Sequence, residues 1–486
     1  MKIKLFNVVI AIAAIIFIFV SDPKPSKAEI MDMTGGVKDD YTYEEYVFIT
    51  GKPVRFTGDA SSVTVTRKES KGKITETYKM TLTGPNKGDK LTRTVKYDLD
   101  VENYDAIGQS TANGKLSSFD EKITINGITY SIVKNGYHIT KGRVTDNLPA
   151  SNYFDEIITG TKKYEYKDNG ITFNILVEVQ SKLVGYENFW GSTETQMTEQ
   201  TIRFADGSVG TIKNTVSSSK TRKLEYEKNP ASLSSFYGGY YVKTEESAVS
   251  KFHYNLKGYG SGSFTLNASK TPAIERLIVP KFRDLSNHWA KDSIEKLYSL
   301  GVFNDNSNFF SPNTPMTRLD FTIAIGKAID LRVEDQKNNK NKNKQKIFPD
   351  LNTNIKDYEY IVSAVEKGVI KGTLDYKTGK RIFEPNGYIL REQAATIFVR
   401  ALGLESKAPD PGYRTNFRDN AAISDYARDG VYIASELGLM NGDEYGNFRP
   451  NEPLTRAQAS AVIIRFLEYL EKDLQQNYRE DILFFE

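Results

Sequence analysis

The chain has 486 residues and no cysteine, and its 65 basic and 62 acidic residues give a formal net charge of +3. The lack of cysteine excludes a disulfide framework and a thiol nucleophile. Residues 1–28 hold four lysines and one aspartate, so the rest of the chain carries 61 basic and 61 acidic residues and is neutral. A neutral chain gives no electrostatic reason to expect a nucleic acid or an anionic membrane as partner.

Residues 1–28 are predicted to be a secretory signal peptide. Lys2 and Lys4 precede an apolar run over residues 8–20, and Ser26-Lys27-Ala28 offers a small-x-small cleavage site. The run is short for a membrane-spanning helix, which needs about 20 residues. An uncleaved membrane anchor is the alternative. Secretion without disulfides indicates a bacterial protein with a domain large enough to bury its own core. No membrane partner is expected after cleavage.

Residues 29–256 are predicted to form an all-β region, as an antiparallel sheet or a sandwich. Runs such as Val63–Arg67, Glu121–Ile125 and Ile171–Ile175 alternate polar and apolar residues and are rich in Val, Ile and Thr. Hairpin turns are expected at four pairs: Asn126-Gly127, Asn135-Gly136, Asn169-Gly170 and Asp206-Gly207. Residues 257–280 begin Gly/Ser-rich and are interpreted as a linker.

Three similar segments follow, over residues 281–335, 347–405 and 416–475. Each opens with Phe-x-Asp and later carries Pro-Asn, with an Arg six residues after that Pro. An internal repeat of this size indicates one supersecondary unit built three times. The opening and arginine positions are Phe282, Phe348 and Phe417, and Arg318, Arg391 and Arg456.

Each segment is predicted to contain two helices joined by a loop. The first helix ends at a Gly placed for a left-handed C′ position: Gly301, Gly368 or Gly438. The second helix begins at the Arg and repeats one apolar stripe in the same register. The stripe residues are Phe321, Ala324, Ile325, Ala328 and Ile329; Ala394, Ile397, Phe398, Ala401 and Leu402; and Ala459, Val462, Ile463, Phe466 and Leu467. Such pairs bury their stripes only against one another. Residues 336–346, rich in Lys and Asn, are expected to be a disordered basic insertion.

The arginine at the start of each second helix is the feature with chemical meaning. A cation in the first turn opposes the positive end of the helix dipole. It is favourable where an anion binds to the guanidinium and to the free helix amides, and a carboxylate suits the planar guanidinium best. The alternative, a salt bridge to a neighbouring segment, is equally compatible with the spacing.

The residues Phe282-Arg-Asp-Leu-Ser-Asn-His-Trp-Ala290, Ser311-Pro-Asn313 and Thr317-Arg-Leu-Asp320 resemble the S-layer homology (SLH) module. Residues 416–475 show the same motifs, including Phe417-Arg-Asp419 and Thr455-Arg-Ala-Gln458. The resemblance covers roughly residues 280–470. It implies a three-pronged helical bundle whose grooves bind an acidic secondary cell-wall polysaccharide, often one that carries a pyruvate ketal. The carboxylate of that ketal would be the anion.

The resemblance assigns roles to individual residues. Arg318 and Arg456 should bind the carboxylate, with Arg391 as their counterpart in the second segment. Asp284, Asp350 and Asp419, at the Phe-x-Asp position, would accept from sugar hydroxyls or cap the first helix. Trp289 and Tyr426 would either face the sugar ring or pack in the core. Gly372 and Gly442 would let the sugar approach the backbone.

The second segment departs from the pattern, because Leu390 replaces the N-capping Thr and its turn, residues 373–383, is longer. The first segment has Asp305 where the others have Gly372 and Gly442. We therefore expect grooves of unequal strength.

Signals for catalysis are weak. The chain has three histidines, lacks a His-Glu-x-x-His motif, and offers no recognisable nucleophile elbow or phosphate loop. No metal or cofactor is expected, and the chain is predicted not to be an enzyme. A glycosidase needs only two carboxylates, so the alternative is an SLH-anchored surface enzyme whose β region acts on or binds polysaccharide. Trp190 is a candidate platform for that ligand or a core residue.

The sequence thus predicts a secreted surface protein of a Gram-positive-type bacterium, anchored non-covalently to the wall. Its expected partners are an acidic cell-wall polysaccharide and, for the β region, itself or other surface-layer proteins. The fold class is an N-terminal all-β region followed by an all-α bundle.

Overall fold

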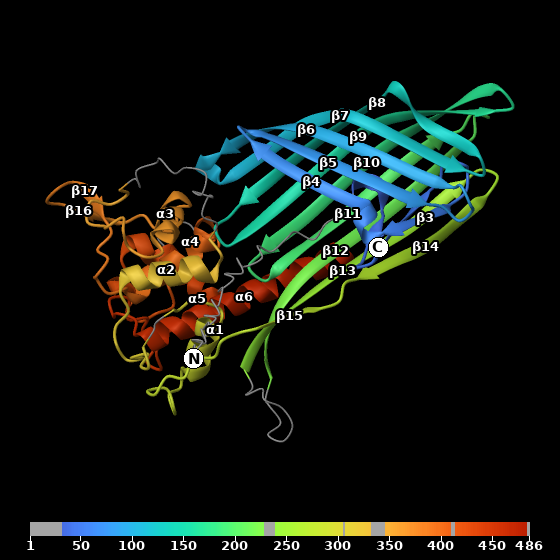
Figure 1. The fold of residues 1–486 in the computed structure, drawn as a ribbon. Coiled ribbons are helices and arrows are strands. Elements are labelled where there is room, and N and C mark those ends of the chain that lie inside the picture. Colours follow the sequence, from blue (N-terminus) through green and yellow to red (C-terminus); the bar gives the residue numbers. More distant parts are fainter. Residues whose placement is uncertain (1–31, 228–238, 305–306, 332–345, 410–413, 484–486) are drawn as a thin grey trace, which may run out of the picture.

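The computed structural model describes residues 32–227, 239–304, 307–331, 346–409 and 414–483. They form a large curved β-sheet and a smaller cluster of helices at one end of it (Figure 1). The predicted signal peptide, most of the basic insertion and Asp305 lie outside the described residues.

In the part of the chain that the structure describes, the β region is one antiparallel sheet of 15 strands, ordered β1-β2-β3-β5 and then consecutively to β14, with β4 on β5 and β15 on β13. The strands are β1 (Val37–Lys38), β2 (Thr42–Val47), β3 (Val54–Asp59), β4 (Val63–Ser70), β5 (Lys73–Thr83), β6 (Lys90–Tyr104), β7 (Gln109–Ile125), β8 (Ile128–Asn147), β9 (Ser151–Asp168), β10 (Ile171–Asn188), β11 (Gly191–Arg203), β12 (Val209–Glu227), β13 (Gly239–Leu256), β14 (Gly260–Ser269) and β15 (Ala273–Arg276). The prediction of an antiparallel sheet is confirmed, and the sandwich alternative is not what forms.

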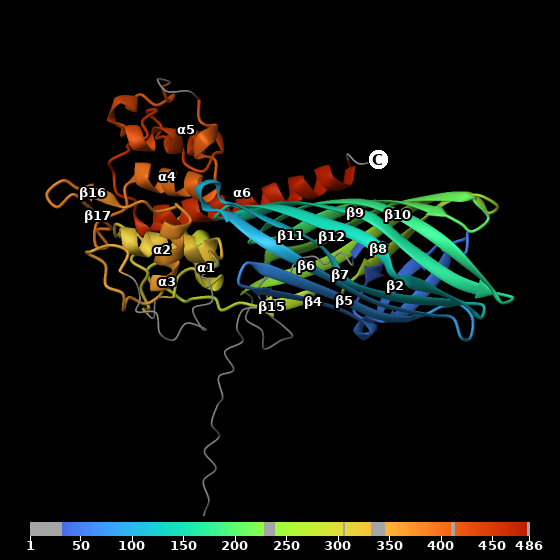
Figure 2. The same cartoon turned by 90° about the horizontal axis from the view of Figure 1, so that it is seen from above.

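The sheet is rolled, so that its two ends meet (Figures 1 and 2). The hydroxyl of Ser250 on β13 donates to the carbonyl of Gly35, just before β1, at 2.7 Å. The backbone N–H of Thr271, after β14, donates to Asp40 at 2.7 Å. Strands far apart in sequence therefore share one interior.

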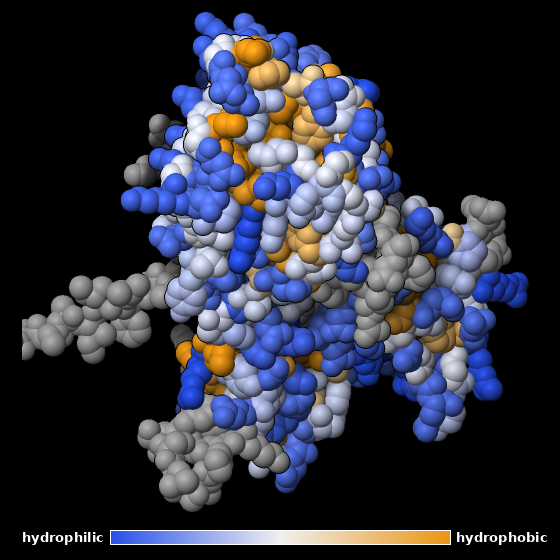
Figure 3. Space-filling view, turned by 90° about the vertical axis from the view of Figure 1, so that its right-hand side faces the viewer, coloured by the Kyte–Doolittle hydropathy of each residue, from blue (hydrophilic) through white to orange (hydrophobic). Residues whose placement is uncertain are grey.

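Alternation along each strand separates the inner face of the roll from the outer face. On β5 the inward residues Ile74, Glu76, Tyr78, Met80 and Leu82 are buried, whereas the residues that alternate with them are exposed or half-buried. At the end of the roll that lies away from the helices, hydrophobic residues appear on the surface as patches among hydrophilic ones (Figure 3). The apolar core of this region lies inside the roll.

The hairpin signals have two outcomes. Asn126-Gly127, Asn169-Gly170 and Asp206-Gly207 lie between consecutive strands, and five of these six residues have the positive φ that such turns favour. Asn135-Gly136 instead lies within β8, where the register to β9 shifts between Ile132 and Tyr137. This pair therefore forms a bulge rather than a turn.

The linker predicted at residues 257–280 is wrong over most of its length. Residues 260–269 form β14, which pairs with β13, and residues 273–276 form β15. Phe264 stacks on Phe252 with ring centroids 4.8 Å apart. Cross-strand aromatic packing outweighs the local preference of Gly and Ser for irregular structure.

The C-terminal part contains three helix pairs: α1 (Lys291–Ser299) with α2 (Arg318–Ala328), α3 (Tyr358–Glu366) with α4 (Arg391–Ala401), and α5 (Arg428–Glu436) with α6 (Arg456–Leu483). Gly301, Gly368 and Gly438 follow the first helices with φ near +70°, at +75°, +71° and +68°. All fifteen predicted stripe residues are buried in one continuous core. A small hairpin, β16 (Thr373–Asp375) and β17 (Lys380–Ile382), occupies the long turn of the second segment.

Helix α6 runs past residue 475, the expected end of the third segment, to Leu483, and connects the two regions (Figures 1 and 2). Leu470 and Leu474 continue its apolar stripe and are buried. Trp190, 4% exposed, donates from its indole N–H to the carbonyl of Leu467 at 2.7 Å. The side chain of Asn188 donates to the carbonyl of Leu470 at 2.7 Å. Trp190 is therefore packed at the interface between the two regions.

Among the described residues, none of the helices is both long enough and apolar enough to span a membrane.

Candidate functional site

The three helix pairs contact one another in a closed cycle. Short antiparallel bridges join Thr317 to Tyr388, Leu390 to Pro453, and Thr455 to Pro315. Each bridge lies just before a second helix, so the N-terminus of each second helix meets the loop of the next segment. This geometry brings the three predicted arginines to the junctions between segments.

Arg318 and Arg391 make the same contact across their junctions. The Nε–H of Arg318 donates to the carbonyl of Phe383 at 2.9 Å, and that of Arg391 to the carbonyl of Phe448 at 2.7 Å. Arg391 Nη2 also donates to the carbonyl of Asn441 at 2.9 Å. Burial lowers the pKa of both guanidinium groups, which nevertheless stay charged.

Arg456 completes the cycle at the junction of the third and first segments. Its guanidinium carbon lies 4.3 Å from the ring centroid of Phe310, the residue that corresponds to Phe383 and Phe448. Its backbone N–H donates to the carbonyl of Thr314 at 2.9 Å. The contacts described for these three arginines are hydrogen bonds to backbone carbonyls and a guanidinium–ring contact.

The three aspartates of the Phe-x-Asp motif bind backbone amides of the loop within their own segment. Asp284 accepts from the N–H groups of Phe310 and Ser311 at 3.0 and 2.7 Å. Asp350 and Asp419 do the same for residues 383–384 and 448–449. Burial opposes ionisation of Asp284, but the two amide donors outweigh it and lower its pKa.

This arrangement changes the expected role of these aspartates. They neither cap the first helix nor point a free carboxylate at a sugar. Each fixes the Phe whose carbonyl or ring meets the arginine of the preceding segment. Asp350 and Asp419 are therefore positioning residues for Arg318 and Arg391.

The helix N-termini follow the sequence prediction. Thr317 and Thr455 accept from the N–H groups of Asp320 and Gln458 at 3.1 and 3.2 Å. Leu390 has no acceptor side chain, and only the return bond remains, from its N–H to Gln393 at 3.2 Å. The second helix of the middle segment thus has half a capping box.

Arg318 lines a cavity of about 540 Å³ beside the second helix pair. Lys371, Arg381 and Arg400 also line it, and none of the described residues of its lining is acidic. Val369, Ile370 and Ile397 add an apolar wall. We call this cavity the Arg318 groove. Its volume lies within the range of small-molecule sites.

Tyr426 is part of the Arg318 groove, whereas Trp289 is not part of its described lining. Tyr426 is 52% exposed, and its hydroxyl donates to Glu392 at 2.8 Å. Burial and this bond raise its pKa, so the hydroxyl remains protonated. Trp289 is 66% exposed beside His288. Neither is a core aromatic.

The two predicted site glycines have an internal reason to be glycine. A Cβ on Gly372, which also has φ +66°, would lie 2.5 Å from the ring of Phe348. A Cβ on Gly442 would lie 2.9 Å from the ring of Phe417. These contacts account for both glycines through packing against the Phe of the Phe-x-Asp motif.

Sequence reasoning missed Lys371, Arg381, Arg400 and Glu392. The first three lie outside the repeat motif, since Arg381 belongs to the hairpin that only the second segment carries. Glu392 is 2% exposed and accepts from Ser424 and Tyr426 of the third segment. Its position directly after Arg391, where the other segments have Leu319 and Ala457, was the available signal.

Comparison with known families identifies part of this region. Residues 281–322 and 416–460 match the S-layer homology domain. The first and third segments are therefore SLH modules, and the middle segment lies outside the match. SLH modules place the protein at the cell surface, anchored to the wall.

Curated relatives share the SLH-bearing part. The chain is 31% identical over 211 residues to an amylopullulanase of Thermoanaerobacterium thermosulfurigenes, which covers 43% of this chain and 11% of the relative. It is 29% identical over 211 residues to the exoglucanase XynX of Acetivibrio thermocellus, a match that covers 43% of this chain and 18% of the relative. It is 27% identical over 187 residues to the surface-layer 125 kDa protein of Lysinibacillus sphaericus, a match that covers 38% of this chain and 14% of the relative. The chain thus spans less than a fifth of the length of each of these relatives.

These relatives correct one prediction. We predicted that the chain is not an enzyme, because no catalytic motif was found. Proteins named as an amylopullulanase, an exoglucanase and an endoglucanase share its SLH-bearing part. The prediction of a non-catalytic protein is therefore withdrawn. The matches cover about two fifths of the chain and assign no activity to the β region.

Proposed function

We propose that the three helix pairs form one three-pronged SLH bundle, in which the middle segment, residues 347–405, is a divergent SLH module. The support is the closed cycle of bridges and the equivalent placement of Arg318, Arg391 and Arg456. The middle segment keeps its buried stripe, its Gly at C′ and its Asp-bound loop. It differs where the Thr cap is lost and where β16 and β17 are inserted.

The Arg318 groove is proposed to bind an acidic secondary cell-wall polysaccharide. The observation that carries this proposal is the groove's lining, whose described residues include four cationic side chains and no acidic one. Lys371 and Arg400 share a single carboxylate, Glu405, at 3.5 and 3.0 Å. A sugar carboxylate would supply the missing negative charge, with the apolar wall against the ring. Avidity over several junctions would strengthen the attachment.

Co-sedimentation of the full chain with purified cell-wall sacculi tests this anchor. Binding should disappear when acid treatment strips the secondary polymer from the sacculi. The triple variant Arg318→Ala/Arg391→Ala/Arg456→Ala should lose roughly a hundredfold or more in affinity, and added salt should weaken the wild type. Arg283→Ala, at an exposed arginine outside the groove's lining, is the matched control. Binding that survives both stripping and the triple variant would mean that the array recognises another wall component.

For the β region, we propose that it binds or acts on polysaccharide. Two observations favour this over a purely structural role: several proteins that share the SLH-bearing part have carbohydrate-active names, and a polar cavity lies inside the roll. Retention of the chain on insoluble glucans and chitin, and release of reducing sugar from them, would test it. If the chain is not retained and releases no reducing sugar while its wall anchor is intact, the proposal is refuted.

A further inference from the structure

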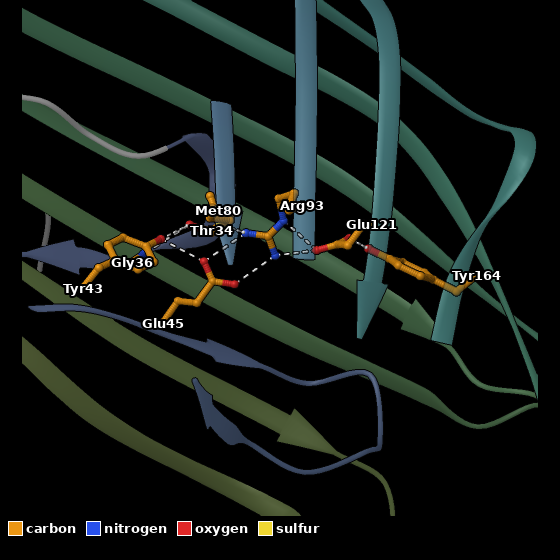
Figure 4. A network of polar contacts seen from close by, with 8 residues as sticks. All are labelled: Thr34, Gly36, Tyr43, Glu45, Met80, Arg93, Glu121 and Tyr164. Atoms are coloured by element: carbon orange, nitrogen blue, oxygen red, sulfur yellow. Dashed lines mark hydrogen bonds and ion pairs between the residues drawn. The ribbon is translucent and has the colours of Figure 1, made fainter. Parts of the chain in front are cut away.

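The inner face of the roll buries two groups of charged residues in addition to its apolar core. The first group is centred on Arg93 (Figure 4). Its guanidinium binds Glu45 through two bonds of 2.9 Å and Glu121 through one of 2.6 Å. Tyr43 and Tyr164 donate to the same two carboxylates. Only about 60 Å³ of space lies beside this group, which is therefore packed.

The second group is centred on Lys141 and is built differently. Lys141 Nζ lies 2.9 Å from Glu76 and 3.0 Å from Glu156. The three side chains are 5–7% exposed. Burial opposes the charged form, but the electrostatic effects of Tyr78, Glu156 and Glu76 outweigh it, so the pKa of Lys141 is raised and the amine stays charged. A buried ion group of this kind seldom stabilises a fold more than apolar residues of the same volume would.

This second group opens onto a cavity of about 340 Å³, which we call the inner cavity. Arg67 and Lys270 at its rim are 40% and 41% exposed, so the lining grades from solvent to a buried floor. Its residues come from Gly36, from several strands that include β1 and β13, and from Lys270 after β14. Only the rolling of the sheet brings them together.

The lining of the inner cavity is balanced in charge. It has five cations and four carboxylates among its described residues, and its main charges are already paired. Glu246, for example, binds Lys220 at 2.7 Å and also Lys270. A charged ligand would have to break such pairs. A hydroxyl group donates and accepts at once, and so adds to them without displacing a charge.

We infer that the inner cavity binds a neutral, polyhydroxylated ligand of one or two sugar units. Ser218, Ser219 and Ser247 supply further hydroxyls, and Tyr78 adds an aromatic wall. The volume lies at the lower end of the range for small-molecule sites, about 300–1,000 Å³. This inference rests on the proposed polysaccharide role of the β region and gives that role a location and a ligand class.

The test is calorimetric titration of the full chain with cellobiose, maltose and N,N′-diacetylchitobiose, and with glucuronate and glutamate as charged probes. At least one neutral disaccharide should bind with one-to-one stoichiometry. Glu156→Gln at the floor should weaken it about tenfold or more, because hydrogen bonds to a charged acceptor are lost. Asp155→Asn is the matched control, since Asp155 is the adjacent residue, 49% exposed on the outer face of β9.

Two further variants keep the test decisive if Glu156→Gln folds poorly. Ser218→Phe places a large side chain in the cavity and should abolish binding, while Lys270→Ala changes only the rim and should weaken it. Thermal unfolding verifies that each variant is folded.

The outcomes separate the two proposals. Retention on polymers without disaccharide binding, or binding that persists in Glu156→Gln and Ser218→Phe, would overturn the inner cavity as the site. Binding of the charged probes alone would overturn the ligand class. Loss of binding in Arg318→Ala, with Ser218→Phe unaffected, would move the sugar to the SLH groove. Lack of retention on every polymer would instead refute the proposed function of the β region.

Discussion

The Arg318 groove and the inner cavity are both lined by charged side chains, yet they differ in how those charges are paired. The groove has four cations without a carboxylate in its described lining, whereas the cavity has five cations and four carboxylates. Unbalanced charge in a partly buried site favours a counter-charge from a ligand. Balanced charge is already neutralised, so what remains available is hydrogen bonding. The balance of charge, more than its amount, therefore distinguishes the proposed anion site from the proposed sugar site.

The largest effect on the free energy of unfolding is expected at the packed charge group around Arg93, which we expect to be structural. Arg93→Met leaves Glu45 and Glu121 buried without their cation. This should lower the free energy of unfolding by about 3–5 kcal/mol, measured by urea denaturation. The triple variant Glu45→Gln/Arg93→Met/Glu121→Gln removes the charges together and should recover part of the loss. A single variant within about 0.5 kcal/mol of wild type would contradict the distinction between a packed group and an open one.

A smaller effect is expected at the contact between the two regions. Trp190→Phe keeps an aromatic ring but removes the hydrogen bond to Leu467, and should cost about 1 kcal/mol. Both regions should still unfold in one transition. Far-UV circular dichroism monitors this transition, because its signal does not depend on the substituted tryptophan. Tyr241→Phe, on a half-buried residue bonded to Glu225, serves as a control away from α6. Separate transitions in the wild type would show that the regions are not coupled.

The most gradual change is expected with acid. Charged partners lower the pKa of Glu76 and Glu121 although burial opposes them. A carboxylate whose pKa is lower in the folded state stabilises the fold above its unfolded value, about 4.3, and loses that contribution as the pH falls further. The thermal midpoint should therefore be nearly level from pH 7 to about pH 5 and fall below it. A midpoint that does not fall by pH 3 would contradict the assigned ionisation of this interior.

The helical part was predictable because its signals are local and repeated. One apolar register recurs three times, and Gly301, Gly368 and Gly438 mark the same helix end. The role of Asp284, Asp350 and Asp419 was not predictable, because the amides they bind are 26 to 34 residues away. The groove cations outside the motif depend on how the chain folds around the second segment.

The β region was predictable in class but not in curvature. Alternation identified strands, yet no local signal tells that a meander of this length rolls until Asp40 meets Thr271. A signal for the inner cavity was present, because Glu76 lies in register with Ile74, Tyr78 and Met80, and Lys141 with Ile139. A charge at an inward position of an otherwise apolar series marks a polar interior. Its partners, however, come from strands across the roll.

The extension of α6 has a mechanical consequence for a protein held at the cell surface. A pull on the sheet reaches the helical part through the chain between β15 and α1 and also through the contacts of Trp190 and Asn188 with α6. These bonds are spread along the helix axis, so a force parallel to that axis loads them together in shear. A force across the axis would instead peel them one at a time. The attachment should therefore resist dragging along the helix far better than lifting from its end.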